Sequence, residues 1–207
     1  AISYAVSSGT CSLSGSTLTA GDAGSLCEVE VTRALSANYN QGTSNPISIT
    51  IQRATPTLGS LTLSRKTFGD APFTLTAPSA DYNSVSVAGS WTYTSAQASV
   101  ATINASTATV TGGGTSVLTA TFTPDDSTNF VTPSTTSTLT VDKATPTFSW
   151  TNVSATYGDA DITIVSPAVA TTSATGTWTY SSADTSVVAL ACTKHDVLDA
   201  GYAVVSA

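Results

Sequence analysis

Several aspartates lie at positions where they could bind a metal ion. Calcium takes about six to eight oxygen ligands, which loops at a junction between domains could supply. The other interpretation is that each Asp caps a turn that contains Gly. We favour the turn, because the matching loop in the first part of the chain has Ala34-Leu35 in place of Asp125-Asp126. The remaining candidates are Asp70, Asp159 and Asp161.

His195 is the only histidine, and it follows Cys192 by three residues. Cys and His are zinc ligands, but a closed zinc site needs about four and this stretch supplies two. A Ser-His-Asp triad needs an acid that holds the far imidazole nitrogen. Asp196 is adjacent in sequence, and neighbours on a strand point to opposite faces. We therefore expect a surface turn here, and we predict no catalytic residue, no cofactor and no metal in the chain.

Tryptophan rings could stack on carbohydrate or fill a core. Trp91 and Trp178 occupy matching positions in a repeated strand pattern, which favours the core interpretation. Trp150 has no aromatic counterpart, and its environment stays open. Whether each ring is exposed for stacking or buried in a core depends on the strands that carry it.

Composition indicates a β-rich chain that binds neither nucleic acid nor membrane. Only 9% of the 207 residues are charged, and 41% are hydrophobic. Thr and Val, which are abundant, suit a pleated sheet. The net charge is −7 and the longest basic run is Arg65-Lys66, whereas phosphate binding needs clustered positive charge. No stretch reaches the ~20 apolar residues that span a bilayer.

An internal repeat organises the sequence. Matching motifs recur in the same order about 90 residues apart, with small shifts that loop deletions would produce. They divide the chain into the back part of a first repeat (1–53), a complete middle repeat (54–143) and the front part of a third repeat (144–207). The matched motifs are Ala54-Thr55-Pro56-Thr57 with Ala144-Thr145-Pro146-Thr147, Thr67-Phe68-Gly69-Asp70-Ala71 with Thr156-Tyr157-Gly158-Asp159-Ala160, Gly89-Ser90-Trp91-Thr92-Tyr93 with Gly176-Thr177-Trp178-Thr179-Tyr180, and Asn38-Tyr39 with Asn129-Phe130.

Each repeat reads as a set of short strands. Apolar and polar residues alternate over 117–122 and 137–141, and turn clusters such as Gly112-Gly113-Gly114 separate the strands. About seven strands in ~90 residues predict an all-β chain of sandwiches. A barrel is the alternative, although barrels rarely form arrays. The expected core is Leu75, Trp91, Tyr93, Val100, Ile103, Val110, Leu118, Ala120, Phe122, Phe130, Leu139 and Val141.

The motifs Ala144-Thr-Pro-Thr147, Tyr157-Gly-Asp-Ala160, Trp178-Thr-Tyr-Ser-Ser182 and Asn38-Tyr39-Asn40 resemble bacterial immunoglobulin-like repeats of the MBG, or YGD-containing, type. Such repeats build giant surface proteins and adhesins, and similar ones occur in phage and large-virus virion proteins. The resemblance covers the whole chain and implies tandem immunoglobulin-like β-sandwiches, joined end to end. The chain departs from it at Cys192-Thr-Lys-His-Asp196, where the family has a bland turn.

Cys11 and Cys27 match a cysteine pair that similar repeats often carry at this spacing, so we predict a disulfide between them. The repeat frame places Cys11 on Ala101 and Cys27 close to Leu118, in adjacent strand regions. Two buried free thiols are the alternative. A disulfide implies an oxidising compartment. Cys192 has no matching cysteine here, so we expect any partner to lie elsewhere.

The repeat boundaries lack flexible linkers. Arg53 and Lys143 end one repeat, and Ala-Thr-Pro begins the next, with no Gly/Ser stretch between. We therefore expect a non-enzymatic structural segment of an extracellular stalk, adhesin or surface filament. A virion fibre or capsid or tail decoration protein is the alternative, and a carbohydrate-binding module is the second.

The expected partners are neighbouring repeats or copies of the same protein. Host or cell-surface glycans would be bound by regions outside this chain, and the expected location is extracellular, on a cell or virion surface. Asn104-Ala-Ser106 and Asn152-Val-Ser154 fit the glycosylation sequon, which matters only in a source that glycosylates it. Both ends fall within a repeat, which we expect in a piece of a longer array rather than in a polymer whose copies complete one another.

Overall fold

The computed structural model describes residues 1–156, 158–160, 162–170, 175–183, 185, 189–191 and 203–206. Within those ranges the fold is all-β, with every regular element a strand. No helix that could cross a membrane occurs in the same ranges. Two compact units are present, Ala1–Ala144 and Thr145–Ala207, so the division falls one residue from the predicted start of the third repeat. The predicted boundary at 53/54 lies inside the first unit and stays a prediction.

Alternation in the sequence sets the strands of the middle repeat. Strand β15 (Gly114–Pro124) buries every second residue, because successive side chains on a strand point to opposite faces. Leu118 and Ala120 are fully buried on that inner face, whereas Val117 points outward and is 43% exposed. The strand lies between β12 (Gly89–Ser95) and β16 (Ser134–Asp142), both antiparallel to it.

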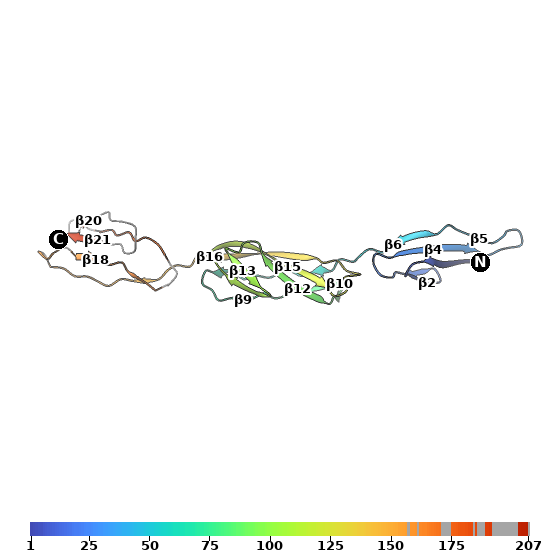
Figure 1. Cartoon of the computed structure of the whole chain (residues 1–207), viewed down its shortest axis with the longest axis horizontal. Helices are drawn as coiled ribbons and strands as arrows, with labels where there is room; N and C mark the ends of the chain where they lie inside the picture. The colour runs from blue at the N-terminus through green and yellow to red at the C-terminus, as the bar shows by residue number, and fades with distance from the viewer. Residues whose placement is uncertain are drawn as a thin grey trace. The chain divides into compact units, whose positions relative to one another are not determined.

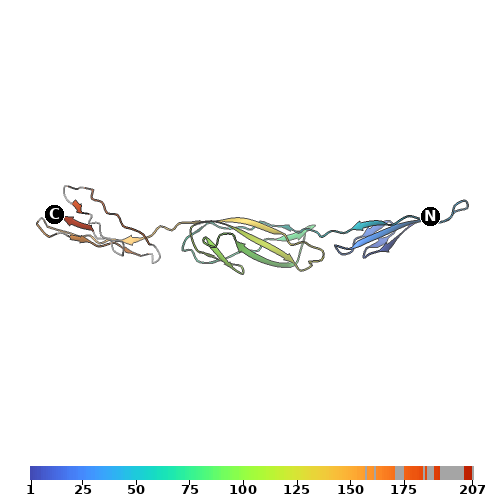
Figure 2. The same cartoon turned by 45° about the horizontal axis from the view of Figure 1, so that its top comes forward.

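Two sheets enclose the core of the middle repeat. One runs β12-β15-β16-β8 and the other β13-β14-β9, and Figure 2 shows these strands, in green and yellow, as two layers. Side chains from both sheets meet in one cluster, which includes Ala101, Ala108, Leu118 and Leu139, all with no exposed surface. The other strands are β7 (Thr57–Leu58), β8 (Lys66–Thr67), β9 (Phe73–Thr74), β10 (Ala80–Tyr82), β11 (Val85–Ser86), β13 (Ala101–Asn104) and β14 (Thr107–Val110).

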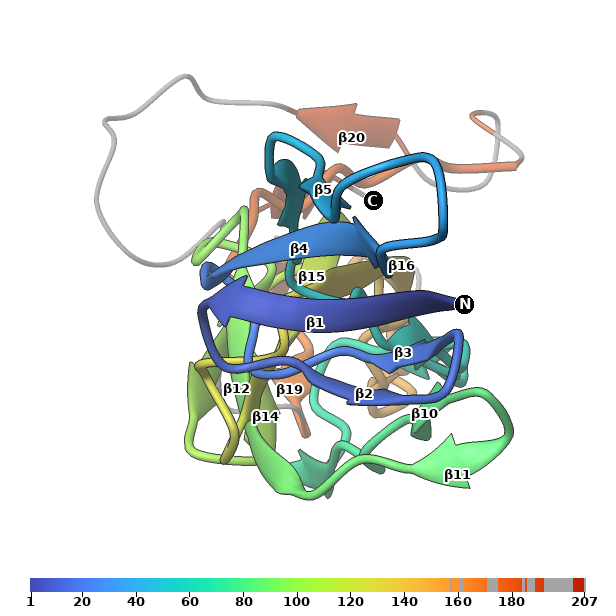
Figure 3. The ribbon, with the colours of Figure 1, turned by 90° about the vertical axis from the view of Figure 1, so that its right-hand side faces the viewer.

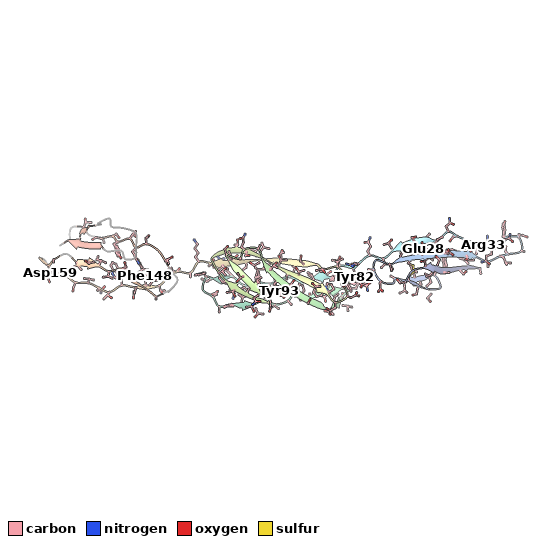
Figure 4. All side chains as sticks on the ribbon, in the orientation of Figure 1. Glu28, Arg33, Tyr82, Tyr93, Phe148 and Asp159 are labelled. Carbon is pink, nitrogen blue, oxygen red and sulfur yellow. A yellow bond between two sulfur atoms is a disulfide. The ribbon has the colours of Figure 1, made fainter. Side chains whose placement is uncertain are left out.

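The predicted core is mostly correct. Seven of its members are buried, and the other five, Trp91, Tyr93, Ile103, Val110 and Phe130, are half-buried. Figure 4 labels Tyr93 among the strands of this repeat. The sequence analysis missed Leu61, Ala101 and Ala108, which the same cluster buries.

The residues before β12, 54–88, are called here the front segment of the middle repeat. They close the core by contributing Leu61 and Leu75, which are 3% and 4% exposed. They also pair with both sheets, because β8 lies parallel to β16 and β9 lies antiparallel to β14. A small sheet in the order β11-β10-β7 completes the segment.

The first repeat has a smaller core under one sheet. Figure 3 shows β1 and β4 side by side, with the β2–β3 hairpin next to them. Cys11, Cys27 and Val29 are buried, and Val6, Leu13, Leu18 and Ile49 pack against them. The strands are β1 (Ile2–Ser8), β2 (Ser12–Ser14), β3 (Thr17–Thr19), β4 (Leu26–Arg33), β5 (Gly42–Thr43) and β6 (Ile47–Thr50).

Strand registers in the first and middle repeats coincide. The sheet β1-β4-β6 matches β12-β15-β16, and the β2–β3 hairpin matches β13–β14, at separations of 89 or 90 residues. The register places Cys11 on Ala101, as predicted, and Cys27 on Ser116, two residues before the Leu118 that it was predicted to lie close to. The matching cross-strand pairs are Tyr4 and Val31 with Tyr93 and Ala120, Cys27 and Ile49 with Ser116 and Leu139, and Ser12 and Thr19 with Thr102 and Thr109.

The described part of the second unit contains short strands in two sheets, labelled in part in Figure 1. Trp150 is 54% exposed and lies 5.8 Å from the ring of Tyr180, and Phe148 packs edge to face on Trp178 at 5.1 Å. The strands are β17 (Phe148–Ser149), β18 (Ile162–Ile164), β19 (Ala168–Val169), β20 (Ala189–Ala191) and β21 (Ala203–Ser206).

Candidate functional site: the junction of the first and middle repeats

The chain passes from the first repeat into the middle repeat with only two residues between fixed points. Ile51 is held by the turn before β4, because its carbonyl accepts the Gly24 N–H at 2.7 Å. Ala54 forms a parallel bridge with Phe130: its N–H donates to the Asn129 carbonyl at 2.8 Å, and its carbonyl accepts the Val131 N–H at 2.9 Å. Gln52 and Arg53 alone lie between these anchors.

The Asn129 side chain reaches across this junction. Its Oδ1 accepts the Ala23 N–H at 2.8 Å, and its Nδ2 donates to Asp22 Oδ1 at 3.2 Å and to Asp126 Oδ2 at 2.9 Å. The amide therefore uses both its acceptor and its donor group. The backbone N–H of Asn129 also donates to Asp126 Oδ1, at 3.1 Å. One side chain thus ties the turn 21–24 of the first repeat to the 125–130 loop of the middle repeat.

The negative charge on the Asp126 carboxylate helps to hold the Asn129 side chain in place. Hydrogen bonds from the side chain and backbone of Asn129 lower the pKa of the Asp126 carboxyl, because they stabilise its ionised form. The ionised carboxylate accepts both N–H groups of Asn129 and so orients its amide. Asp126 acts here as a positioning group for Asn129.

A surface hollow of about 470 Å³ lies on the middle repeat beside the same loop. Tyr82 and Phe130 pack edge to face in its wall, with ring centroids 5.6 Å apart. Asn83 and Ser84 turn the chain between β10 and β11 with positive φ angles of 51° and 64°. Figure 4 labels Tyr82 at the end of the middle repeat. Apolar rings next to Asp125 and Asp126 could hold a small ligand with an apolar face and hydroxyl groups.

The recurring aspartates cap turns. Asp70 Oδ2 accepts the Thr67 N–H at 2.9 Å, and the Asp70 N–H donates to the Thr67 carbonyl at 3.0 Å. Asp159 makes the same pair of bonds with Thr156, at 2.7 and 3.0 Å.

The glycine before each of these aspartates, Gly69 or Gly158, has a φ above +90°, which explains its recurrence. Among the described residues, no group of three or more His, Cys, Asp and Glu side chains could hold a metal ion. Asp161 lies outside the described residues.

Cys11 and Cys27 form a disulfide, with Cα atoms 5.8 Å apart, which agrees with the expected pair. It joins the start of the β2–β3 hairpin to β4 and lies in the centre of the small core. The alternative of two free thiols does not apply to this structure.

The other candidate residues are dispersed. Trp91 packs against the core and lies 5.1 Å from Phe122, so its ring is part of the packing rather than of an open aromatic platform. Asn104 lies exposed at the β13–β14 turn, and Asn152 is also exposed. Cys192, His195 and Asp196 lie outside the described residues.

Comparison with protein-family models, with curated proteins and with solved structures found no match to this chain.

Proposed function

We propose that the chain is a non-enzymatic structural repeat segment of an extracellular stalk, adhesin or surface filament, built from immunoglobulin-like sandwiches joined end to end. The observation that carries this proposal is the junction at 51–54, where two residues connect two hydrogen-bonded positions and Asn129 bridges both repeats. A repeat that holds a tip at a distance needs such a connection, because a flexible linker behaves as a coil and does not keep its ends apart.

The arrangement of strands also supports a mechanical role. In the middle repeat β16 pairs with β15 over its length and with β8 at its end, so the last strand of the repeat is tied to the front segment within one sheet. Pulling on the ends of the repeat loads several backbone hydrogen bonds together rather than one after another. The disulfide limits how far the first repeat can be stretched. The residues between Cys11 and Cys27 cannot extend under force while the bond is intact.

The disulfide supports an extracellular location. Disulfides persist in oxidising compartments and are rare in the reducing cytosol. Few apolar side chains are buried in the first repeat, so the disulfide is expected to contribute a large part of its stability.

Single-molecule pulling from the two ends of the chain tests the proposal. A structural segment predicts a discrete unfolding peak for the middle repeat, and a contour-length gain for the first repeat that increases after reduction by the length of residues 12–26. Extension at low force without peaks would contradict the proposal. Cys11→Ser with Cys27→Ser is the matched control, because its trace should be the same with and without reductant.

A further inference from the structure

One face of the first repeat is open although its counterpart in the middle repeat is covered. Val6 packs in the small core, and Ile2 and Tyr4 lie on the same face of β1 because they precede it by even steps. Ile47 lies opposite Val29 and shares that face. Ile2, Tyr4 and Ile47 are nonetheless 64%, 46% and 62% exposed.

The counterparts of these residues show what normally covers the face. By strand register, Ile2 and Tyr4 correspond to Trp91 and Tyr93, which are half-buried against the core of the middle repeat. That core includes Leu61 and Leu75, and both come from the front segment, 54–88.

Two backbone edges of the first repeat are open in the same way. In the middle repeat β14 pairs with β9 at Thr107 and Ala108, and β16 pairs with β8 at Val141 and Asp142. The corresponding edges are β3, which pairs only with β2 among the described residues, and Gln52 just after β6. Ile51 is not part of this edge, because its N–H and carbonyl already bond to Ser25 and Gly24. Exposed edges of this kind accept added strands through their free N–H and C=O groups.

We propose that this face binds the front segment of a repeat of this same kind: a stretch with the pattern of residues 54–88, joined in register directly ahead of β1 as residues 54–88 are joined ahead of β12. Two leucines at the positions of Leu61 and Leu75 fill the space over Tyr4 and Ile47. In that added segment, the strand that corresponds to β9 pairs with β3. The strand that corresponds to β8 pairs with the residues just after β6. The inference concerns how repeats are completed and goes beyond the proposed mechanical role.

The test extends the full chain with a second copy of residues 54–89 placed directly before Ala1. The control carries the same extension with Leu61→Asp and Leu75→Asp in the added copy only. Amide hydrogen exchange is read at Thr17–Thr19 and at Gln52, at low micromolar concentration. Exchange of β15 and β16 reports in every sample that the middle repeat stays folded.

The expected result is that the extension slows exchange at Thr17–Thr19 by at least about tenfold relative to the parent chain, whereas the control extension does not. Equal exchange with the intact and the substituted extension would overturn the proposal. Protection of the same amides in the parent chain, rising together with a dimer mass, would also overturn it, because the occupant would then be a second copy that offers its own residues 145–170.

Discussion

The first and middle repeats share strand registers but differ in how much they bury. Both place an aromatic residue of the first strand opposite a small apolar residue of the second, Tyr4 opposite Val31 and Tyr93 opposite Ala120. The front segment, 54–88, adds Leu61 and Leu75 to the core cluster of the middle repeat, which is larger than the cluster of the first repeat. The back strands keep the same register in both repeats, and burial is deeper where the front segment packs against them.

The largest expected contrast comes from matched core truncations. Leu118 and Val29 occupy equivalent positions, but Leu118 has no exposed surface and Val29 lies beside an open face. We expect Leu118→Ala to lower the free energy of unfolding of the middle repeat by about 4 kcal/mol, because it leaves a cavity in a closed core. Val29→Ala should cost the first repeat about 1 kcal/mol, because the open site can collapse.

Denaturant unfolding followed by hydrogen exchange of each repeat separates the two effects. Val117→Ala, at an outward position next to Leu118, is the control and should change little. Equal losses of unfolding free energy for Leu118→Ala and Val29→Ala would show that the first repeat is as well packed as the middle one. That result would contradict the proposed difference in burial.

Removing the disulfide should affect one repeat only. Cys11→Ser with Cys27→Ser opens a short loop, which lowers the stability of the first repeat by about 3 kcal/mol in the chain-entropy model. With so small a core, that loss is expected to unfold the first repeat while the middle repeat melts as before. Intact-mass analysis after alkylation without reductant provides the check on the parent chain. Ready alkylation of Cys11 in the folded protein would contradict the bond.

A transplanted disulfide sharpens the register equivalence. Ala101 and Ser116 occupy the positions of Cys11 and Cys27, so Ala101→Cys with Ser116→Cys should oxidise to a bond within the middle repeat. The gain in stability should be below the ~3 kcal/mol of a loop of this length, because Ser116 loses its hydrogen bonds to Ser95 and to the Gln97 N–H. Two free thiols in the folded variant would show that the registers do not correspond.

The smallest expected effect is a pH dependence at the junction loop. Hydrogen bonds from Asn129 lower the folded-state pKa of Asp126 below its ordinary value of 3.8. The stabilisation is therefore complete above pH 3.8 and is lost as the pH falls through the folded-state pKa. NMR should show the Asn129 amide signals shifting in that acid range. Asp126→Asn keeps the shape without the charge, so an unchanged pH profile in this variant would contradict the assignment.

Sequence patterns predicted the strands better than the contacts between distant segments. Leu118 and Leu139 were identifiable because alternation places them on one face, whereas Ala101 and Ala108 are buried by close packing that a small side chain does not signal. Ser116 is buried because its hydroxyl bonds to Ser95 and accepts the Gln97 N–H, which alternation alone does not reveal.

The role of Asn129 is an example of a contact that could not be predicted from the sequence. The repeat match pairs it with Asn38, but its hydrogen bond to the Ala23 N–H spans 106 residues. Nothing local to either residue specifies that pairing. The absence of a linker at 53/54 predicted a direct connection, and the side chain that bridges it became visible only in three dimensions.

Stiffness of the junction is the central claim, and a distance between two spin labels reports it. Thr19 and Thr136 are exposed strand positions in the first and middle repeats. Labels at Thr19→Cys and Thr136→Cys, in a Cys192→Ser background, leave the disulfide and the junction intact. Two comparison variants carry Asn129→Ala or a Gly-Ser insertion between residues 53 and 54.

Double electron–electron resonance then gives the distribution of label-to-label distances in each variant. The account predicts a narrow distribution in the parent chain, a broader one with Asn129→Ala, and the broadest with the insertion, because each change removes a constraint on the junction. A parent distribution as broad as that of the insertion variant would show that the two repeats move freely, and would contradict the account.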